Sequence, residues 1–213
     1  EGQVIPLDLS KEEDNEEFRN ILKEKKPKVE LLINNAGFAL YGFSDSLPLK
    51  EQLSMMKVNN LALVAVTHLV LPYMERGGEI IQVSSAMAFL PFPKFSVYSA
   101  TKAFVLSYSV TLRAEIRPRG INSTALCPGP VRTEFFQRAD AQSFFLRHFA
   151  FPPRLVARMG LFFSRLKRPV AVDPIIFLYN ILARIVPKSA LFFLGAFRAS
   201  AEAPAKDGTS RED

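Results

Sequence analysis

The sequence predicts an α/β protein built around a parallel β-sheet. Short apolar runs alternate along the chain with helical segments of roughly 15 to 25 residues, a spacing typical of βαβ units with right-handed crossovers. Hydrophobic residues make up 48% of the 213 residues and charged residues 23%, as expected of a chain that folds around a packed core. The chain is also long enough to bury such a core without disulfide bonds.

Five apolar runs are predicted to be strands. Each is short and is bounded by polar or turn residues, as buried strands of parallel sheets usually are. In chain order these runs are 4–7, 29–33, 79–84, 121–127 and 167–173.

Five segments between or after these runs are predicted to be helices. Proline lacks a backbone N–H and glycine is a poor helix former, so both residues mark helix ends. Pro27, Gly77-Gly78 and Pro118 end the first three segments. In chain order the expected helices are 11–26, 49–74, 97–117, 153–166 and 174–186.

The expected division of the chain has three parts. Residues 1–173 form one α/β catalytic domain, and residues 174–198 form two short, apolar and basic helices separated by Pro187. Residues 199–213 are rich in Ala, Pro, Glu, Lys and Ser and are expected to be disordered. The chain begins with Glu1 rather than Met and shows no signal peptide, so we expect a fragment or a processed product of a cytoplasmic protein.

Positive charge is concentrated near the C-terminus. Residues 138–200 hold ten Lys or Arg against two Asp or Glu, and they also carry ten of the nineteen phenylalanines. This composition fits an element in peripheral contact with a membrane, and it fits equally a substrate-binding cap with buried phenylalanines and solvated arginines. Nucleic acid is not expected as a partner, because long apolar groups separate the basic residues and no nucleic-acid motif occurs. With Cys127, His68 and His148 as the whole Cys/His set, no metal site is expected either.

Small or polar residues follow four of the predicted strands. They are Asp8, the run Asn34-Asn35-Ala36-Gly37, Ser84-Ser85 and Pro128-Gly129. Parallel-sheet proteins bind their ligands beyond the carboxyl ends of the strands, where Gly and Asn let the backbone approach a ligand closely. We therefore expect these four strand ends to face a common binding crevice.

The candidate reaction centre consists of Ser85, Tyr98 and Lys102. Tyr98 and Lys102 are four residues apart at the start of a predicted helix, so they share one face of it. Lowering the pKa of a tyrosine from about 10 to about 7 requires roughly 4 kcal/mol. One ammonium about 4 Å away supplies on the order of 4 kcal/mol at an effective dielectric of about 20. Lys102 could thus make Tyr98 an acid–base group, while the Ser85 hydroxyl polarises a substrate carbonyl.

These residues, taken in order, resemble the short-chain dehydrogenase/reductase family. The resemblance rests on the Asn-Asn-Ala-Gly strand end, on a serine 13 residues before a Tyr-Ser-Ala-Thr-Lys motif, and on Asn59 and the run Pro128-Gly129-Pro130-Val131-Arg132-Thr133. The segment around Cys127 is most similar to a branch of bacterial-type reductases with a hydrophobic, basic C-terminus. Fatty-acyl and steroid ketone reductases lie nearby in the family.

The resemblance implies an NAD(P)-dependent reductase of ketones or aldehydes, with a small, hydrophobic, lipid-like carbonyl substrate. Tyr98 would be the general acid, Lys102 would lower its pKa and hold the nicotinamide ribose, Ser85 would orient the carbonyl, and Asn59 would hold a water in a proton relay. NADP is slightly preferred to NAD as the cofactor, and a homo-oligomer is expected. The implied cofactor-binding residues, besides Tyr98 and Lys102, are Asp8, Leu9, Asn35, Ala36, Gly37, Pro128, Gly129, Val131 and Thr133.

The chain departs from the family pattern at its start. The family has a Rossmann-like, doubly wound sheet of strand order 3-2-1-4-5-6-7, and its first strand leads into a Thr-Gly-x-x-x-Gly-x-Gly loop. None of the ten glycines here has that spacing. The resemblance therefore implies an incomplete sheet, with the first two strands and the glycine-rich loop missing. The run 4–7 would lack its native neighbour, and the strand 29–33 would present an open edge.

Several alternatives remain open from the sequence. Asn34 may serve only to bond neighbouring strands, Asn59 may be an ordinary polar helix residue, and Asp8 or Ser10 may cap the helix 11–26. The function also has two readings. One is an NAD(P)-dependent carbonyl reductase; the other is a non-catalytic, truncated form that acts as a binding partner or is inactive.

We predict that the isolated 213-residue chain binds NADP(H) weakly or not at all. A glycine-rich loop at a helix N-terminus is the main pyrophosphate site of such folds, and the sequence does not contain that loop. Isothermal titration calorimetry of the chain with NADPH measures the affinity. Micromolar binding would contradict this prediction.

Overall fold

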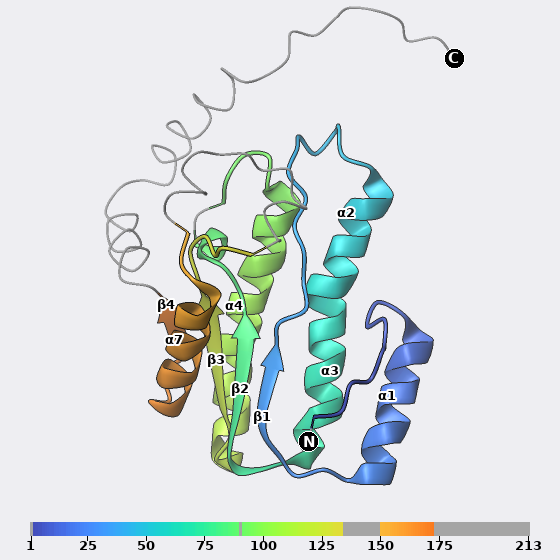
Figure 1. The fold of residues 1–213 in the computed structure, drawn as a ribbon, viewed down its shortest axis with the longest axis vertical. Coiled ribbons are helices and arrows are strands. Elements are labelled where there is room, and N and C mark those ends of the chain that lie inside the picture. Colours follow the sequence, from blue (N-terminus) through green and yellow to red (C-terminus); the bar gives the residue numbers. More distant parts are fainter. Residues whose placement is uncertain (1, 90, 134–149, 173–213) are drawn as a thin grey trace, which may run out of the picture.

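Four parallel strands form the sheet, which confirms the predicted α/β class (Figure 1). The computed structural model describes residues 2–89, 91–133 and 150–172. The strands lie side by side in the order β1-β2-β3-β4, the order that the family resemblance implies for these segments. Their carboxyl ends all point to the same edge of the sheet. The strand bounds are β1 Val29–Asn34, β2 Met74–Val83, β3 Asn122–Cys127 and β4 Val170–Val172.

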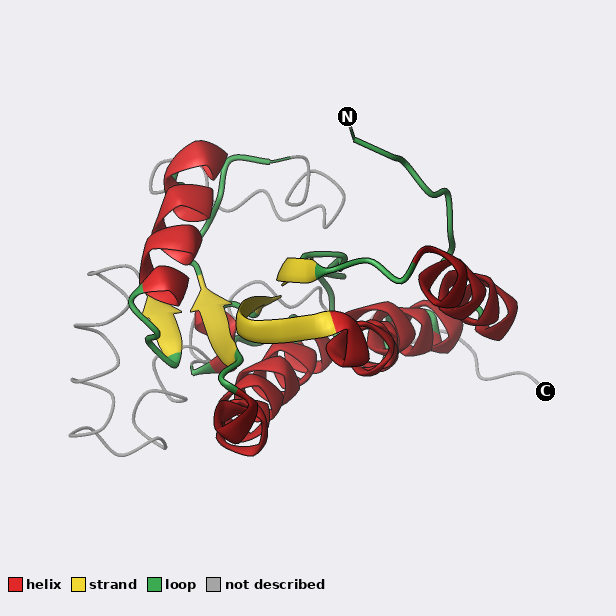
Figure 2. Cartoon of the chain, turned by 90° about the horizontal axis from the view of Figure 1, so that it is seen from below, coloured by secondary structure: helices red, strands yellow, loops and turns green. Residues whose placement is uncertain are grey.

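Helices cover both faces of this sheet (Figure 2). On one face α3 and α4 lie against the strands, and α1 packs beside α3; α7 lies on the opposite face against β2 and β3. This two-sided cover makes the sheet Rossmann-like, as predicted. The helix bounds are α1 Glu12–Lys25, α2 Leu49–Met56, α3 Leu63–Val70, α4 Ser96–Ile116 and α7 Pro153–Arg165. Short 3₁₀ turns occur at Leu71–Tyr73, Ala86–Ala88 and Arg117–Arg119.

The predicted long helix 49–74 is one continuous helical path with a π-helical segment, Lys57–Ala62 (η1), between α2 and α3. Within the described residues, the stretch Leu49–Tyr73 is long and apolar enough to cross a membrane by composition, with a mean hydropathy of 1.3. Its apolar side chains Leu63, Val66 and Val70 are instead buried within the domain. We therefore interpret it as a core helix, whose apolar face packs against the sheet.

The main hydrophobic core lies between the sheet and the layer formed by α1, α3 and α4. Ile80 on β2 is fully buried and packs with Val70 of α3 and Ile116 of α4. A smaller cluster, in which Ile81 meets Leu126 and Ala171, fills the opposite face under α7. Because neighbouring residues of a strand point to opposite faces, Ile80 and Ile81 anchor one helix layer each.

The prediction of a strand at residues 4–7 is wrong. These residues run as an irregular segment, and only residues 29–34 and later ones form strands in the described chain. A strand needs a neighbour for its ladder of hydrogen bonds, and no described strand lies beside 4–7. The expected open edge is observed on β1, where Leu31 and Ile33 remain 39% and 49% exposed.

Asn34 bonds neighbouring elements together, as the structural alternative predicted. Its Nδ2 donates to Oε1 of Gln82 at 2.9 Å and to Oγ1 of Thr67 at 2.8 Å. Gln82 lies opposite Asn34 on β2, and both Gln82 and Thr67 are fully buried. Asn34 therefore joins β1 to β2 and α3 just before the chain leaves the sheet.

The predicted start of the strand 79–84 is wrong: β2 begins at Met74 and contains Gly77 and Gly78, which were expected to end the preceding helix. The other predicted elements agree with the structure to within a few residues or lie outside its described part. The expected strand 167–173 is shorter, at Val170–Val172, and the expected helix 153–166 is α7. The expected helix 174–186, the apolar segment 174–198 and the tail 199–213 lie outside the described residues.

We predict that Asn34→Ala lowers the free energy of unfolding by about 1–3 kcal/mol, because it leaves the buried carbonyl of Gln82 without its donor. Urea denaturation followed by circular dichroism measures the change. Asn20→Ala, at an exposed position of α1, is the matched control and should change stability by less than about 0.5 kcal/mol. Equal effects of the two substitutions would contradict the assigned role of Asn34.

Candidate functional site

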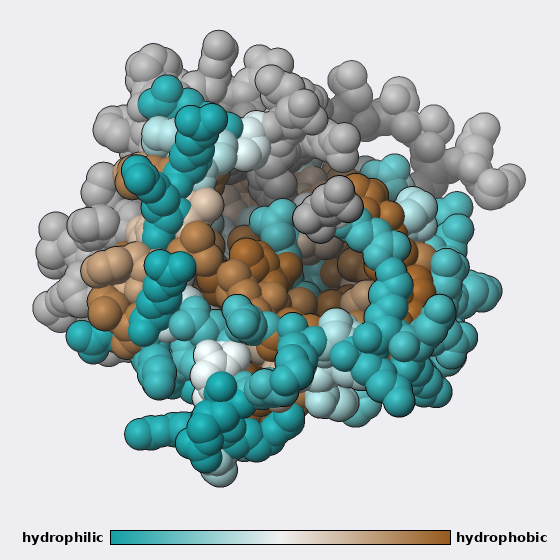
Figure 3. Space-filling view, turned by 60° about the horizontal axis from the view of Figure 1, so that its bottom comes forward, coloured by the Kyte–Doolittle hydropathy of each residue, from teal (hydrophilic) through white to brown (hydrophobic). Residues whose placement is uncertain are grey.

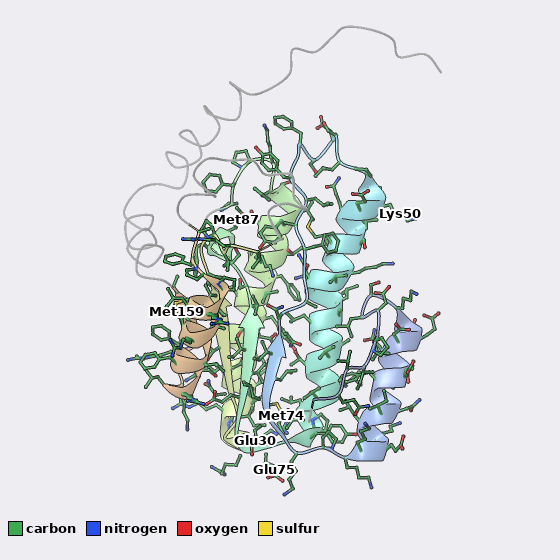
Figure 4. All side chains as sticks on the ribbon, in the orientation of Figure 1. Glu30, Lys50, Met74, Glu75, Met87 and Met159 are labelled. Carbon is green, nitrogen blue, oxygen red and sulfur yellow. The ribbon has the colours of Figure 1, made fainter. Side chains whose placement is uncertain are left out.

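A cavity of about 880 Å³ opens at the carboxyl edge of the sheet. It lies where the chain leaves β1, β2 and β3, and the start of α4 and one side of α7 complete its wall. The loop that bears Met87 rises from this edge (Figure 4). The predicted site residues that line the cavity are Asn35, Gly37, Ser85, Tyr98, Lys102, Pro128, Gly129, Val131 and Thr133.

Ser85 occupies the first turn after β2, where its backbone is still extended. Its hydroxyl accepts a hydrogen bond from the backbone N–H of Met87 at 3.2 Å and so caps the short turn Ala86–Ala88. A side-chain hydrogen bond also joins Ser85 to Tyr98. The two hydroxyl groups, which are 13 residues apart in the sequence, thus lie next to each other in the structure, as predicted.

Tyr98 lies in the first turn of α4 and is buried among aromatic rings. Its ring centroid is 5.9 Å from that of Phe95, which in turn lies 5.0 Å from Tyr41. Burial raises the pKa of Tyr98 to about 12, although the hydrogen bond with Ser85 opposes this change. The phenol is therefore protonated at neutral pH in this structure.

The predicted lowering of the Tyr98 pKa by Lys102 is not observed. Nζ of Lys102 donates to the carbonyl oxygen of Val83 at 2.8 Å and lies 5.8 Å from the centre of the Tyr98 ring. Burial also lowers the pKa of Lys102 itself to about 8. Lys102 is thus not among the groups that shift the pKa of Tyr98, which rises mainly because burial desolvates its hydroxyl.

Asn59 supports the site from outside the cavity wall. Its Oδ1 accepts from the backbone N–H of Phe38 at 3.0 Å, and its Nδ2 donates to the Phe38 carbonyl at 2.9 Å and to Oγ1 of Thr101 at 3.1 Å. Asn59 belongs to the π-helical segment η1, a local distortion that often accompanies functional sites. Its side chain thus forms hydrogen bonds with the loop after β1 and with α4. The role of holding a water molecule stays a prediction.

The absence of a side chain at Gly37 lets the loop after β1 pack closely against η1 and α4. A Cβ atom at this position would lie 2.9 Å from Oδ1 of Asn59 and 3.5 Å from Nζ of Lys102. Only a residue without a side chain leaves room for both groups at the end of β1. The glycine in the Asn-Asn-Ala-Gly run therefore has a steric function here.

Three predicted cofactor contacts are not part of the cavity wall. The Asp8 carboxylate is used locally, since its Oδ1 accepts from the backbone N–H and the hydroxyl of Ser10. Leu9 packs against the core cluster beside α1 and α3, and Ala36 is exposed. Asp8 does not cap α1 directly, because the N-cap residue is Lys11 and makes no side-chain bond. The structure does not bring these residues to the site.

The apolar part of the wall was missed by the sequence analysis. Phe38, Met87 and Phe95 line the cavity near Tyr98, while Val156 and Leu161 line it from α7. Phe95, three residues before Tyr98, was within reach of sequence reasoning, because residues three apart on a helical turn are neighbours. The contribution of α7 carried no such signal, since it depends on how that helix packs on the sheet.

Comparison with known families identifies one match over most of the chain. The sequence model of the family described as short chain dehydrogenase matches residues 2–143. Among curated proteins, serine 3-dehydrogenase of Rhizobium radiobacter is 35% identical over 133 residues, which is 62% of this chain and 53% of that protein. The 11-beta-hydroxysteroid dehydrogenase-like 2 protein of Arabidopsis thaliana is also 35% identical over 133 residues, covering 62% and 43%. The chain thus spans about half the length of the curated relatives that it matches.

Solved structures share the fold. A short-chain dehydrogenase from Sphingobium yanoikuyae in complex with NADPH superimposes with a TM-score of 0.71 and 25% sequence identity, covering 97% of this chain and 78% of that one. A bulky-bulky ketone specific alcohol dehydrogenase from Comamonas testosteroni superimposes with a TM-score of 0.67 at 22% identity, covering 98% and 76%.

We predict that Lys102→Met makes the protein more stable relative to wild type at pH 7 than at pH 10.5. Folding lowers the pKa of Lys102 from 10.5 to about 8, so the buried ammonium disfavours the folded state below pH 8. This penalty declines as the pH rises towards 10.5, because the folded protein loses the proton first. The pH-dependent part of the difference amounts to roughly 3 kcal/mol.

Urea denaturation of both proteins across this pH range measures the difference. Lys57→Met, which removes a lysine at an exposed position, is the matched control. A pH-independent difference for Lys102→Met would mean that the ammonium is not desolvated in the folded protein.

Proposed function

Because the chain belongs to the short-chain dehydrogenase/reductase family, we propose that the protein is an NAD(P)-dependent oxidoreductase that reduces an apolar ketone or aldehyde. The observation that carries this proposal is the clustering of Ser85, Tyr98 and Lys102 on the wall of a mainly apolar cavity. The relatives support the NAD(P)-dependent oxidoreductase part of the proposal, since the names of both curated proteins describe dehydrogenases and the Sphingobium enzyme was solved with NADPH.

Tyr98 is the proposed proton donor to the substrate carbonyl. With a pKa of about 12 its hydroxyl is protonated at neutral pH, which is the form that reduction of a carbonyl requires. The proton moves from the phenol oxygen to the carbonyl oxygen as negative charge develops there. The hydrogen bond with Ser85 lowers the pKa of Tyr98 and so stabilises the phenolate that remains.

Ser85 and Lys102 have supporting roles in this proposal. The Ser85 hydroxyl lines the cavity beside Tyr98, so it can donate to the same carbonyl oxygen and polarise it. The ammonium of Lys102 adds positive charge to this wall, where the substrate carbonyl gains negative charge during reduction. Its pKa of about 8 leaves it mainly protonated at pH 7.

The residues present fit the nicotinamide end of the cofactor. Lys102 lies on the cavity wall next to Gly37, which has no side chain, and Nζ can bond ribose hydroxyls there. Asn35, Gly129, Val131 and Thr133 also lie on the wall and can hold the ribose and the carboxamide. The cofactor, when bound, supplies the hydride, and the protein supplies position and electrostatics.

The proposed substrate is apolar because two sides of the cavity are lined by apolar side chains. Phe38, Met87 and Phe95 line the side near Tyr98, and Val156 and Leu161 line the side formed by α7. Such a wall excludes water from the carbonyl and offers little to bind a charged group. A bulky aliphatic or aromatic ketone fits these surroundings.

We predict that Tyr98→Phe lowers kcat for ketone reduction at least about 100-fold while the affinity for the cofactor changes little, because only the transferable proton is removed. Oxidation of NADPH and of NADH with a panel of aliphatic and aromatic ketones measures turnover of the protein that contains this chain. Tyr73→Phe, in the turn before β2, is the matched control and should retain activity. Near-normal turnover of Tyr98→Phe would overturn the assignment.

A further inference from the structure

The outward side of α7 combines exposed apolar and basic side chains. We define the outer face of α7 as Leu155, Arg158, Phe162, Arg165 and Leu166. The three apolar members are 51%, 59% and 52% exposed, and both arginines are exposed as well. Figure 3 shows apolar groups interleaved with long hydrophilic side chains on the left of the molecule, where α7 lies.

The inner side of α7 is firmly docked, so the helix cannot turn to bury its outer face. Gly160 is buried against the sheet, and a Cβ there would come within 2.9 Å of Cδ2 of Leu126. Oγ of Ser164, which is also buried, donates to Oε2 of Glu79 on β2 at 2.7 Å. Leu155 and Phe162 are therefore exposed because the opposite side of α7 packs against the sheet.

The charge around this face has one sign. Residues 153–172 contain Arg154, Arg158, Arg165, Lys167 and Arg168 and no Asp or Glu. None of these five forms a salt bridge with another described residue. Across the molecule, by contrast, α1 begins with Glu12, Glu13 and Asp14 (Figure 1). The described domain is thus polarised, with its basic and apolar side at α7.

We propose that the outer face of α7 is a docking surface for an anionic lipid membrane. Exposed Leu and Phe side chains can enter the boundary between headgroups and acyl chains, while arginines keep their charged ends among anionic headgroups. The absence of carboxylates from 153–172 removes repulsion from the lipid surface. An anionic surface would repel the acidic first turn of α1, so charge also favours docking through α7 rather than through the α1 side of the domain.

Docking at this face brings the cavity close to the lipid. Val156, Ala157 and Gly160, on the other side of the same helix, line the cavity. An apolar substrate dissolved in the membrane would then reach Tyr98 over a short distance. This consequence rests on the proposed function, whereas the docking surface itself does not.

Co-sedimentation with vesicles tests the proposal on the whole 213-residue chain without cofactor or substrate. The wild-type chain should pellet at low salt with vesicles that contain phosphatidylserine, and it should stay in the supernatant with pure phosphatidylcholine. Arg158→Gln with Arg165→Gln should weaken partitioning about 30-fold, from roughly fivefold per basic residue. Lys23→Gln with Lys50→Gln makes the same change in net charge away from α7 and should bind like wild type. Lys23 lies on α1 (Figure 1) and Lys50 lies on α2 (Figure 4).

A second pair of substitutions tests the apolar part of the face. Leu155→Ser with Phe162→Ser should also reduce pelleting, because it removes apolar side chains that insert into the lipid. Wild-type chain that stays in the supernatant, as it would if the face binds an acidic protein, overturns the proposal. Undiminished pelleting of both α7 variants also overturns it and places the lipid contact elsewhere, for example in residues 174–198. Absence of ketone reduction by the protein that contains this chain, with intact vesicle binding of the chain, would overturn the proposed function alone.

Discussion

Two hydrogen bonds between α4 and the end of β2 hold the reaction centre together. Nζ of Lys102 donates to the carbonyl oxygen of Val83, and the hydroxyl of Ser84 donates to the carbonyl oxygen of Lys102. They fix the rotation and the height of α4 against the sheet. Tyr98 lies one helical turn before Lys102, so the same bonds hold it next to Ser85, the residue after Ser84. A helix free to slide along the sheet would separate these groups.

The π-helical segment between α2 and α3 supports this arrangement from the other side. Asn59 and Asn60 both reach α4 from it: Nδ2 of Asn59 donates to Oγ1 of Thr101, and Nδ2 of Asn60 donates to the Thr101 carbonyl at 2.9 Å. Asn59 also holds the loop after β1 through both backbone groups of Phe38. The loop that carries Gly37 and the helix that carries Lys102 are thus tied to one short distorted segment. Two neighbouring asparagines of the π-helical segment therefore both bond Thr101, an arrangement that accompanies the local distortion of the helix.

Helix α7 connects the interior of the cavity to the surface of the molecule. Its docked side supplies apolar cavity wall, and its other side exposes leucine, phenylalanine and arginine side chains. The close approach at Gly160 makes both possible, because it brings the helix near enough to the sheet to close the cavity. In the two proposals, this one helix would contribute both to the choice of an apolar substrate and to docking on a membrane.

The sequence by itself determined the class of the fold, the strand ends that meet at the site and the group Ser85, Tyr98 and Lys102. These features depend on local periodicity and on the rule that parallel strands point their carboxyl ends to one edge, so they can be predicted without coordinates. Other features were decided by the tertiary structure alone. Residues 4–7 form no strand because strand formation needs a neighbour, and Asp8 bonds Ser10 instead of facing the cavity. The pKa of Tyr98 rises because burial outweighs its hydrogen bond with Ser85, while the ammonium of Lys102 is bonded to the carbonyl oxygen of Val83. Solvation and distance depend on how distant segments pack, and a pattern of residue types does not contain that information.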